Sequence, residues 1–195
     1  MRTRLLLRAL AGTAACLALG YFAFIKGTRV PLLGGVDLGF HELGHLVTYI
    51  FPDVVTAAMG SITQVAVPLG LGVYFMWVRR DWVAGGICLA WAGTSAQDAS
   101  IYIADAPYQM LQLIGGEHDW AFVLGPEHLN MLADANSLAA TVKGFGFVML
   151  LAGISSCLVS PFLEKRKKAA ADRARLAGTQ SSGGWAVIPP WEEGQ

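Results

Sequence analysis

The chain has 195 residues, of which 54% are hydrophobic and only 14% charged, and its formal net charge at pH 7 is zero. A soluble domain usually carries about 25% charged residues, and the apolar residues here come in long runs rather than amphipathic stripes. This composition argues against a soluble protein and for one compact integral membrane domain. Basic residues crowd the two ends of the chain, as in membrane anchoring, so we expect no nucleic-acid partner.

The first expected element is an N-terminal anchor. The apolar run from Leu5 to Ile25 is long enough to cross a bilayer core of about 30 Å. Its basic flank resembles that of a signal peptide, but the run exceeds the usual length and has no clear cleavage site near its end. We therefore expect residues 1–30 to form an uncleaved anchor helix and the loop that follows it.

The second expected element is a helix over residues 36–51 with an HExxH motif at residues 41–45, and it ends because Pro52 cannot continue a helix. Residues 54–78 form another apolar stretch. Its first half contains polar residues, including Gln64, and a proline follows shortly after. Such a stretch either has an irregular backbone that lines a water-filled cavity or is a proline-kinked helix, and the sequence favours neither interpretation.

Two further spans and a tail complete the chain. Residues 83–105 are the most polar span, residues 106–134 form a loop, and residues 135–162 are the last apolar span. The tail begins as a basic helix and continues into a Ser- and Gly-rich segment, which is typical of a flexible terminus. We therefore expect a membrane-embedded domain over residues 1–162 and a basic, flexible tail over residues 163–195.

The number of spans depends on whether the HExxH helix crosses the bilayer. Both ends of the chain are basic and should lie in the cytoplasm, which requires an even number of spans, whereas five apolar segments are present. If residues 36–51 enter the membrane and return, the count becomes four; the alternative is five true spans with one terminus outside. The expected fold is an all-α integral membrane protein with four to five transmembrane or re-entrant helices and the motif on a membrane-embedded helix.

The HExxH motif is the strongest functional indication in the chain. Residues four apart share a helix face, so His41 and His45 can bind one zinc ion, Zn²⁺, while Glu42 suits a general base. Two histidines satisfied in a helical core would give the same pattern. Ionisable residues at membrane depth are costly and usually functional, which favours the metal site.

A catalytic zinc needs a third protein ligand besides the two histidines. The available groups are Asp98, Asp105, His118 and Asp119. Asp98 and Asp105 share a helix face, and Asp98 lies at a depth similar to that of His41, so depth alone favours Asp98. His118 can cap the mouth of the site or orient a ligand, and we expect Asp119 and Gln64 to support a ligand or to contact substrate.

Several segments resemble those of a known family: Gly39 to His45, the polar stretch Gly60 to Pro68, Tyr102 to Ala106, and Gly115 to Trp120. The chain is similar here to site-2-protease-like membrane-embedded zinc metalloproteases, in particular to their compact bacterial branch. The resemblance covers roughly residues 36–120 and depends mostly on HExxH. It implies an aspartate from a later span as third ligand, which places Asp105 first, ahead of Asp98 and His118. The chain lacks the family's asparagine- and proline-rich segment before Leu-Asp-Gly, and it lacks a PDZ-like domain.

The resemblance implies an intramembrane zinc metalloendopeptidase that hydrolyses membrane-protein substrates, with Glu42 as general base on zinc-bound water. The expected partners are a substrate helix and the lipid bilayer. The expected location is a bacterial inner membrane, with the basic termini in the cytoplasm. Two alternatives remain: a non-catalytic membrane scaffold or metal-binding protein that retains the protease-like fold, and a small transporter, because paired acids on one helix face also suit ion relays.

Overall fold

The computed structural model describes residues 2–113 and 117–182, and the regular elements of these residues are all helices. In chain order they are α1 (Arg2–Gly20), the π-helix η1 (Tyr21–Ile25), α2 (Leu33–Thr48), α3 (Asp53–Trp77), α4 (Trp82–Asp105), α5 (Asp119–Leu124), the 3₁₀-helix η2 (Leu132–Asp134) and α6 (Ala135–Ser182). Their contacts divide the chain into one unit of residues 1–160, which contains the HExxH motif, and a second unit of residues 161–195. The expected all-α fold is confirmed for the described residues, and the end of the expected flexible tail, residues 183–195, lies outside them.

The helix boundaries follow local chemistry. Pro52 lacks the N–H that would continue α2, and α3 begins at the next residue. The Asp81 carboxylate caps α4 by accepting the N–H of Ala84 at 3.0 Å, and it also pairs with the Arg8 guanidinium of α1. The polar stretch of α3 is helical throughout, with Pro68 inside the helix, so the backbone irregularity considered for it is absent.

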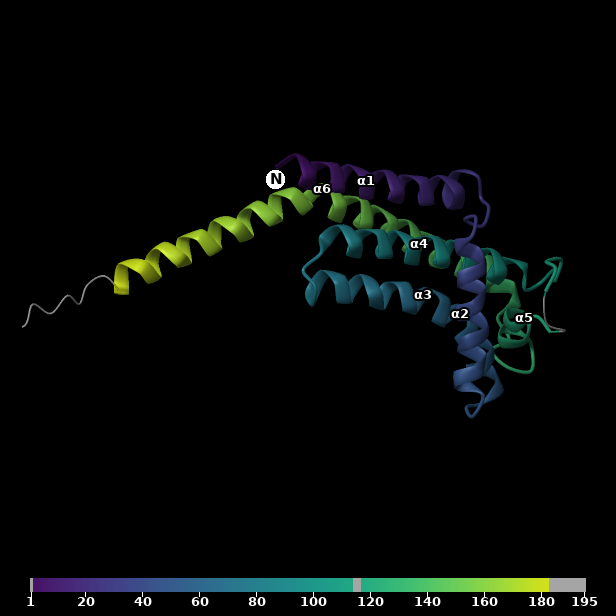
Figure 1. Cartoon of the computed structure of the whole chain (residues 1–195). Helices are drawn as coiled ribbons and strands as arrows, with labels where there is room; N and C mark the ends of the chain where they lie inside the picture. Colours follow the sequence, from purple (N-terminus) through teal and green to yellow (C-terminus); the bar gives the residue numbers. More distant parts are fainter. Residues whose placement is uncertain (1, 114–116, 183–195) are drawn as a thin grey trace, which may run out of the picture. The chain divides into compact units, whose positions relative to one another are not determined.

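In the first unit, α4 packs between α1 and α3 and also contacts the part of α6 that precedes Ser160 (Figure 1). Small residues permit this close approach. A Cβ atom at Gly146 of α6 would lie 2.6 Å from the carbonyl oxygen of Gly93 in α4, closer than real Cβ contacts. Cys16 and Cys157 are fully buried nearby, with 3.9 Å between their sulfur atoms. The result is an α4 surrounded by protein on most sides.

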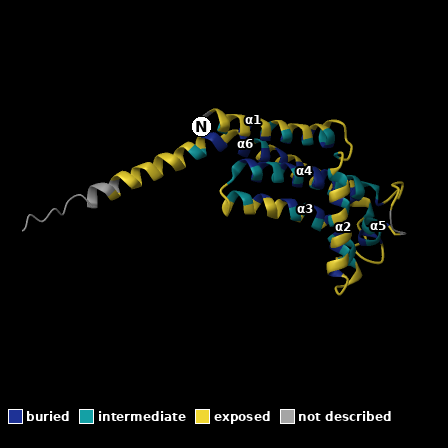
Figure 2. Ribbon diagram, in the orientation of Figure 1, coloured by how far each residue is buried: buried dark blue, intermediate teal, exposed yellow. Residues whose placement is uncertain are grey.

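Three helical segments of the described chain are long and apolar enough to cross a membrane: Thr3–Ile25, Asp53–Trp77 and Leu132–Leu176. Figure 2 shows exposed residues on the outer sides of α1 and α3, whereas α4 is mostly buried or half-buried. Many of the exposed side chains on these helices are large and apolar, as a lipid-facing surface requires. The composition of these helices is therefore that of a membrane protein.

Helix α2 runs crosswise to α1, α3 and α4, and this orientation brings the HExxH motif onto α3 and α4 (Figure 1). Gly44 allows the contact with α3, because a Cβ atom there would collide with the carbonyl oxygen of Met59. Asp37 ties α2 to α4, accepting hydrogen bonds from Trp91 Nε1 at 2.7 Å and from Ser95 Oγ at 2.9 Å. These contacts fix the face of α2 that carries the two histidines.

Candidate metal centre

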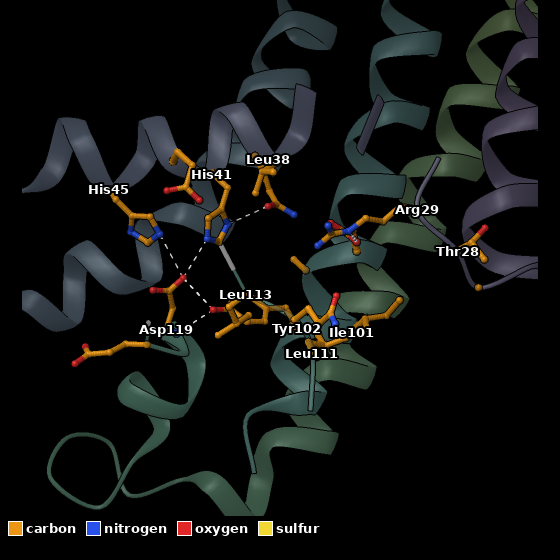
Figure 3. Close-up of a pocket in the computed structure, with 17 residues that line it drawn as sticks. Thr28, Arg29, Leu38, His41, His45, Ile101, Tyr102, Leu111, Leu113 and Asp119 are labelled. Atoms are coloured by element: carbon orange, nitrogen blue, oxygen red, sulfur yellow. Dashed lines mark hydrogen bonds and ion pairs between the residues drawn. The ribbon is translucent and has the colours of Figure 1, made fainter. Parts of the chain in front are cut away.

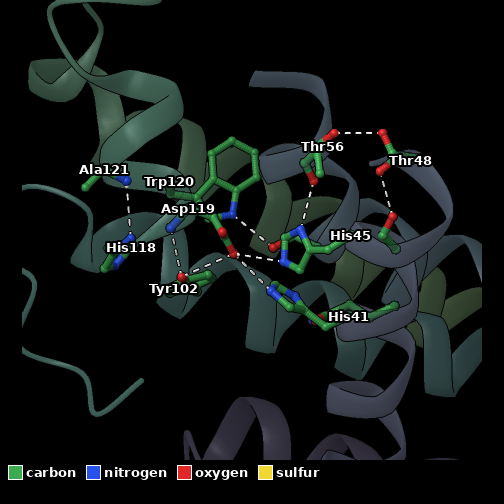
Figure 4. A network of polar contacts seen from close by, with 12 residues as sticks. His41, His45, Thr48, Thr56, Tyr102, His118, Asp119, Trp120 and Ala121 are labelled. Carbon is green, nitrogen blue, oxygen red and sulfur yellow. Dashed lines mark hydrogen bonds and ion pairs between the residues drawn. The ribbon is translucent and has the colours of Figure 1, made fainter. Parts of the chain in front are cut away.

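His41 and His45 lie one turn apart on α2, with 4.8 Å between their ring centroids. Asp119, the first residue of α5, points at both rings: its Oδ2 atom is 3.0 Å from His41 Nε2 and 3.3 Å from His45 Nε2 (Figure 4). One ligand-type atom from each of the three residues lies within 4.8 Å of the others. Among residues 2–113 and 117–182, this is the one group of three such side chains gathered so closely.

The hydrogen bonds behind the imidazole rings determine where their protons lie. The Gln64 amide nitrogen donates to the Ser95 carbonyl at 3.1 Å, which turns Gln64 Oε1 toward His41 Nδ1, also at 3.1 Å. His45 Nδ1 is 2.9 Å from the carbonyl oxygen of Thr56, which can only accept. Both rings therefore carry a proton on Nδ1, and both Nε2 lone pairs face the Asp119 carboxylate.

This arrangement fits a divalent metal ion. Three lone-pair atoms that converge without a hydrogen between them need a cation or an additional proton to relieve their repulsion. Two imidazoles and one carboxylate form a ligand set that suits zinc and several other first-row metals. Gly60 of α3 keeps the space in front of the rings open, because a Cβ atom there would lie 2.6 Å from Nε2 of both His41 and His45.

Contacts to α3 and α4 hold Asp119 in place. The Tyr102 hydroxyl accepts the Asp119 N–H at 3.0 Å and donates to Asp119 Oδ2 at 3.3 Å. The indole N–H of Trp120 donates to Ser61 Oγ at 2.9 Å and so fastens α5 to α3. Asp119 is thus brought to the histidines by the tertiary contacts of a short helix, and not by closeness to them in the sequence.

The structure brings neither Asp98 nor Asp105 into the cluster. Asp98 pairs with Arg29, whose Nε atom lies 2.9 Å from Asp98 Oδ1. Asp105 accepts backbone N–H groups of the segment that follows α4, and its Oδ2 atom lies 3.4 Å from His118 Nε2. The sequence ranks Asp105, Asp98 and His118 as third ligands. In the structure the polar atoms of these three residues face other groups, and Asp119 is the acid that lies against both histidines.

A pocket of about 510 Å³ opens beside the three side chains (Figure 3). Its lining includes the exposed side chain of Glu42, and Gln64 contributes to the wall. The rest of the lining is mixed: Leu38, Ile101, Leu111 and Leu113 are apolar, while Arg29, Asp98 and Glu117 are charged. A carboxylate, a candidate metal site and space for a ligand therefore meet in one cavity, which is the combination that hydrolysis of a bound substrate requires.

Sequence reasoning missed α5 and the part played by Tyr102 and Gly60. The loop expected over residues 106–134 is wrong at residues 119–124, which form α5. His118 followed by the apolar run of residues 120–124 is the sequence signal of this capped helical turn. Tyr102 lies one turn before Asp105 on the polar face of α4. The polarity of that face indicates a functional region, but it does not show that the Tyr102 hydroxyl binds Asp119. The closeness of Gly60 to the imidazoles depends on how α2 crosses α3 and has no local signal.

Comparison with protein-family models, with curated proteins and with solved structures found no match for this chain. Its class is therefore defined by the fold and the site alone. Its described residues form an all-helical structure that contains three helices able to cross a membrane and a His41–His45–Asp119 group that can hold a metal ion.

Proposed function

We propose that this protein is an intramembrane zinc metalloprotease, similar in kind to the site-2 protease type. One observation carries the proposal: two imidazole lone pairs and the Asp119 carboxylate converge beside a pocket that Glu42 also lines. A structural metal site has no need of a carboxylate directly after the first histidine, whereas hydrolysis requires a base at that place.

In this proposal His41, His45 and Asp119 hold the metal. When bound, zinc acts as a Lewis acid that polarises a carbonyl and lowers the pKa of water toward neutrality. The protein's own contribution is to keep its ligands deprotonated and oriented. Gln64 and the Thr56 carbonyl retain the protons on Nδ1 of the two rings, and Tyr102 fixes the Asp119 carboxylate.

Glu42 moves the proton in the proposed reaction. Its carboxylate takes a proton from the attacking water as the water oxygen bonds to the peptide carbonyl carbon. The same proton then passes to the leaving nitrogen as the carbon–nitrogen bond breaks, so Glu42 ends the cycle ionised as it began. A glutamine at this position has the same shape and cannot accept the proton.

The pocket has room for a short segment of a substrate. A volume of about 510 Å³ is on the order of one turn of an α-helix, given a diameter of about 10–12 Å and a pitch of 5.4 Å. In the proposed reaction the substrate segment unwinds locally, so that its carbonyl can reach the site. We propose a membrane-protein helix as substrate, because three segments of this chain are suited to a bilayer.

In the proposed topology α1, α3 and α6, the helices apolar enough to face lipid, cross the membrane. The more polar α4 crosses among them, mostly shielded by protein, and α2 is re-entrant. The crosswise direction of α2 in Figure 1 supports a helix that enters without spanning. An even number of spans keeps both basic ends in the cytoplasm, as the positive-inside rule requires, and a bacterial cell membrane is the proposed location.

The proposal is tested with purified wild type, Glu42→Gln and Glu127→Gln, each mixed with reporter transmembrane helices in detergent. Glu127, an exposed glutamate outside the pocket lining, serves as the matched control. Wild type and Glu127→Gln should cleave a reporter, while Glu42→Gln should bind the same amount of metal and cleave none. Metal binding without cleavage of any reporter by wild type would instead indicate the non-catalytic metal-binding alternative.

A further inference from the structure

The cluster leaves two buried or half-buried polar groups without a role: Asp105 at the end of α4 and His118 just before α5. The Asp105 carboxylate stabilises the turn that follows α4. Its Oδ1 atom accepts the N–H of Met110 at 3.1 Å, and its Oδ2 atom accepts the N–H of Leu111 at 2.9 Å. Both carboxylate oxygens are thus occupied by the segment that forms one wall of the pocket.

His118 connects the same carboxylate to α5. Its Nδ1 atom accepts the N–H of Ala121 at 3.2 Å, so its proton lies on Nε2, and Nε2 is 3.4 Å from Asp105 Oδ2. The side chain of His118 is only 1% exposed. Its Nε2 atom has no partner within hydrogen-bond geometry among the described residues, which leaves Asp105 as the group it faces.

The ring of His118 also stacks on Tyr102, with 4.2 Å between the ring centroids (Figure 4). Tyr102 is the residue that holds both the N–H and the carboxylate of Asp119. Asp119 follows His118 directly in the chain. Any movement of His118 therefore shifts Asp119 through the backbone and through Tyr102 together.

We infer that Asp105 and His118 are positioning residues that set Asp119 at the proper distance from His41 and His45. The inference rests on the proposed metal site, since it assigns these two residues to the placement of the third ligand. Residues around a ligand that fix its orientation typically change metal affinity about 10- to 100-fold when removed. The same inference explains why an aspartate at the end of α4 accompanies the histidine motif without joining the cluster.

The test measures cobalt(II) affinity and the visible absorption of bound cobalt in Asp105→Asn, His118→Asn, the double variant and Asp134→Asn. The asparagine oxygen at position 118 can still cap α5 through the Ala121 N–H but is too short to face Asp105, which separates capping from positioning. Asp134 is the matched control, because it is an exposed aspartate outside the pocket lining. Thermal unfolding of each metal-free variant reports on the fold.

The expected result is about 10-fold weaker cobalt binding in Asp105→Asn and in His118→Asn, with unfolding temperatures close to wild type and with wild-type affinity in Asp134→Asn. The double variant should lose little more than either single one, because both remove the same contact. At saturation the cobalt spectrum should match that of wild type, since the ligands are unchanged.

Wild-type affinity in both single variants would overturn the inference and leave the metal site intact. A changed saturated spectrum in Asp105→Asn would also overturn it, because Asp105 would then be a ligand itself. Absence of cobalt binding by wild type would refute the proposed metal site, and the inference with it.

Discussion

The two imidazole rings of the motif are oriented by one acceptor each, and this detail decides what the site can bind. Gln64 and the Thr56 carbonyl take the Nδ1 protons, so the opposite nitrogens present lone pairs to the cavity. Two histidines packed in a helical core need hydrogen-bond partners for their ring nitrogens, but their lone pairs have no reason to face the same cavity. The residue-scale geometry therefore favours a metal site over two satisfied core histidines.

Replacement of Gly60 by alanine should block metal binding. The new Cβ atom would lie 2.6 Å from Nε2 of both His41 and His45, where a metal ion would have to bind. Metal analysis of the purified variant should give far less than one ion per chain. Gly70→Ala is the control on the same helix, since nothing lies within 4 Å of its Cβ position, and it should retain metal. Equal metal content in the two variants would contradict the proposed position of the ion.

Replacement of Gln64 by methionine should weaken metal binding without removing it. The variant keeps the length of the side chain but loses the acceptor for His41 Nδ1, so the ring loses its fixed proton position and orientation. Metal affinity should fall about 10- to 100-fold, as is typical for loss of such a partner. Isothermal titration with zinc measures the change, and an unaltered affinity would show that Gln64 does not orient the ring.

At the scale of elements, α4 organises the site. One face carries Asp98 and Asp105, and each of these acids holds a segment that lines the pocket, through Arg29 and through Leu111 respectively. Away from this face, α4 contacts α6, where glycines of the two helices lie against one another. Because α4 is packed on several sides, it can hold these two segments at fixed positions, and their positions shape the pocket.

Gly146→Ala should destabilise the packing of α4 against α6. Its Cβ atom would lie 2.6 Å from the Gly93 carbonyl oxygen, so the helices must separate, at a cost of about 1–3 kcal/mol. Gly144→Ala, two residues away on the same helix, meets nothing within 4 Å and should be neutral or slightly stabilising. Unfolding in detergent and denaturant compares the two, and equal stabilities would refute the close contact.

The link between α1 and α4 should depend on pH. Burial raises the pKa of the Asp81 carboxyl, but the Ala84 N–H and the Arg8 guanidinium outweigh it and hold the pKa below its ordinary value. A lowered pKa in the folded state contributes stability above the unfolded pKa of about 3.9, and this stability is lost as pH falls through the folded value. Because the Arg8 side chain is 56% exposed, the contribution is below about 1 kcal/mol.

Asp81→Asn keeps the capping oxygen and removes the charge, so it isolates this effect. The variant should be less stable than wild type at pH 7, and the difference should shrink as pH falls below about 4. Thermal unfolding of both proteins between pH 3 and pH 7 measures it. A stability difference that grows toward low pH would have the wrong sign.

For the molecule as a whole, composition and hydrophobic runs were sufficient to predict an all-helical protein suited to a membrane, because the bilayer permits few alternatives. The HExxH spacing was sufficient to place His41 and His45 together, since that proximity is set within one helix. The sequence spacing gives no reason to prefer Asp119 to Asp105 as the third metal ligand. Its place depends on the docking of α5 through Tyr102 and Trp120, and that contact joins segments far apart in the chain.

His41, His45 and Asp119 together hold one metal ion in the proposed site. The most direct measurement is metal content, by mass spectrometry, of wild type, Asp119→Ala and Asp105→Ala, each equilibrated with excess zinc and freed of unbound ions. We predict about one zinc per chain in wild type and in Asp105→Ala, and almost none in Asp119→Ala. Full occupancy in Asp119→Ala together with loss in Asp105→Ala would contradict the assignment and make Asp105 the third ligand.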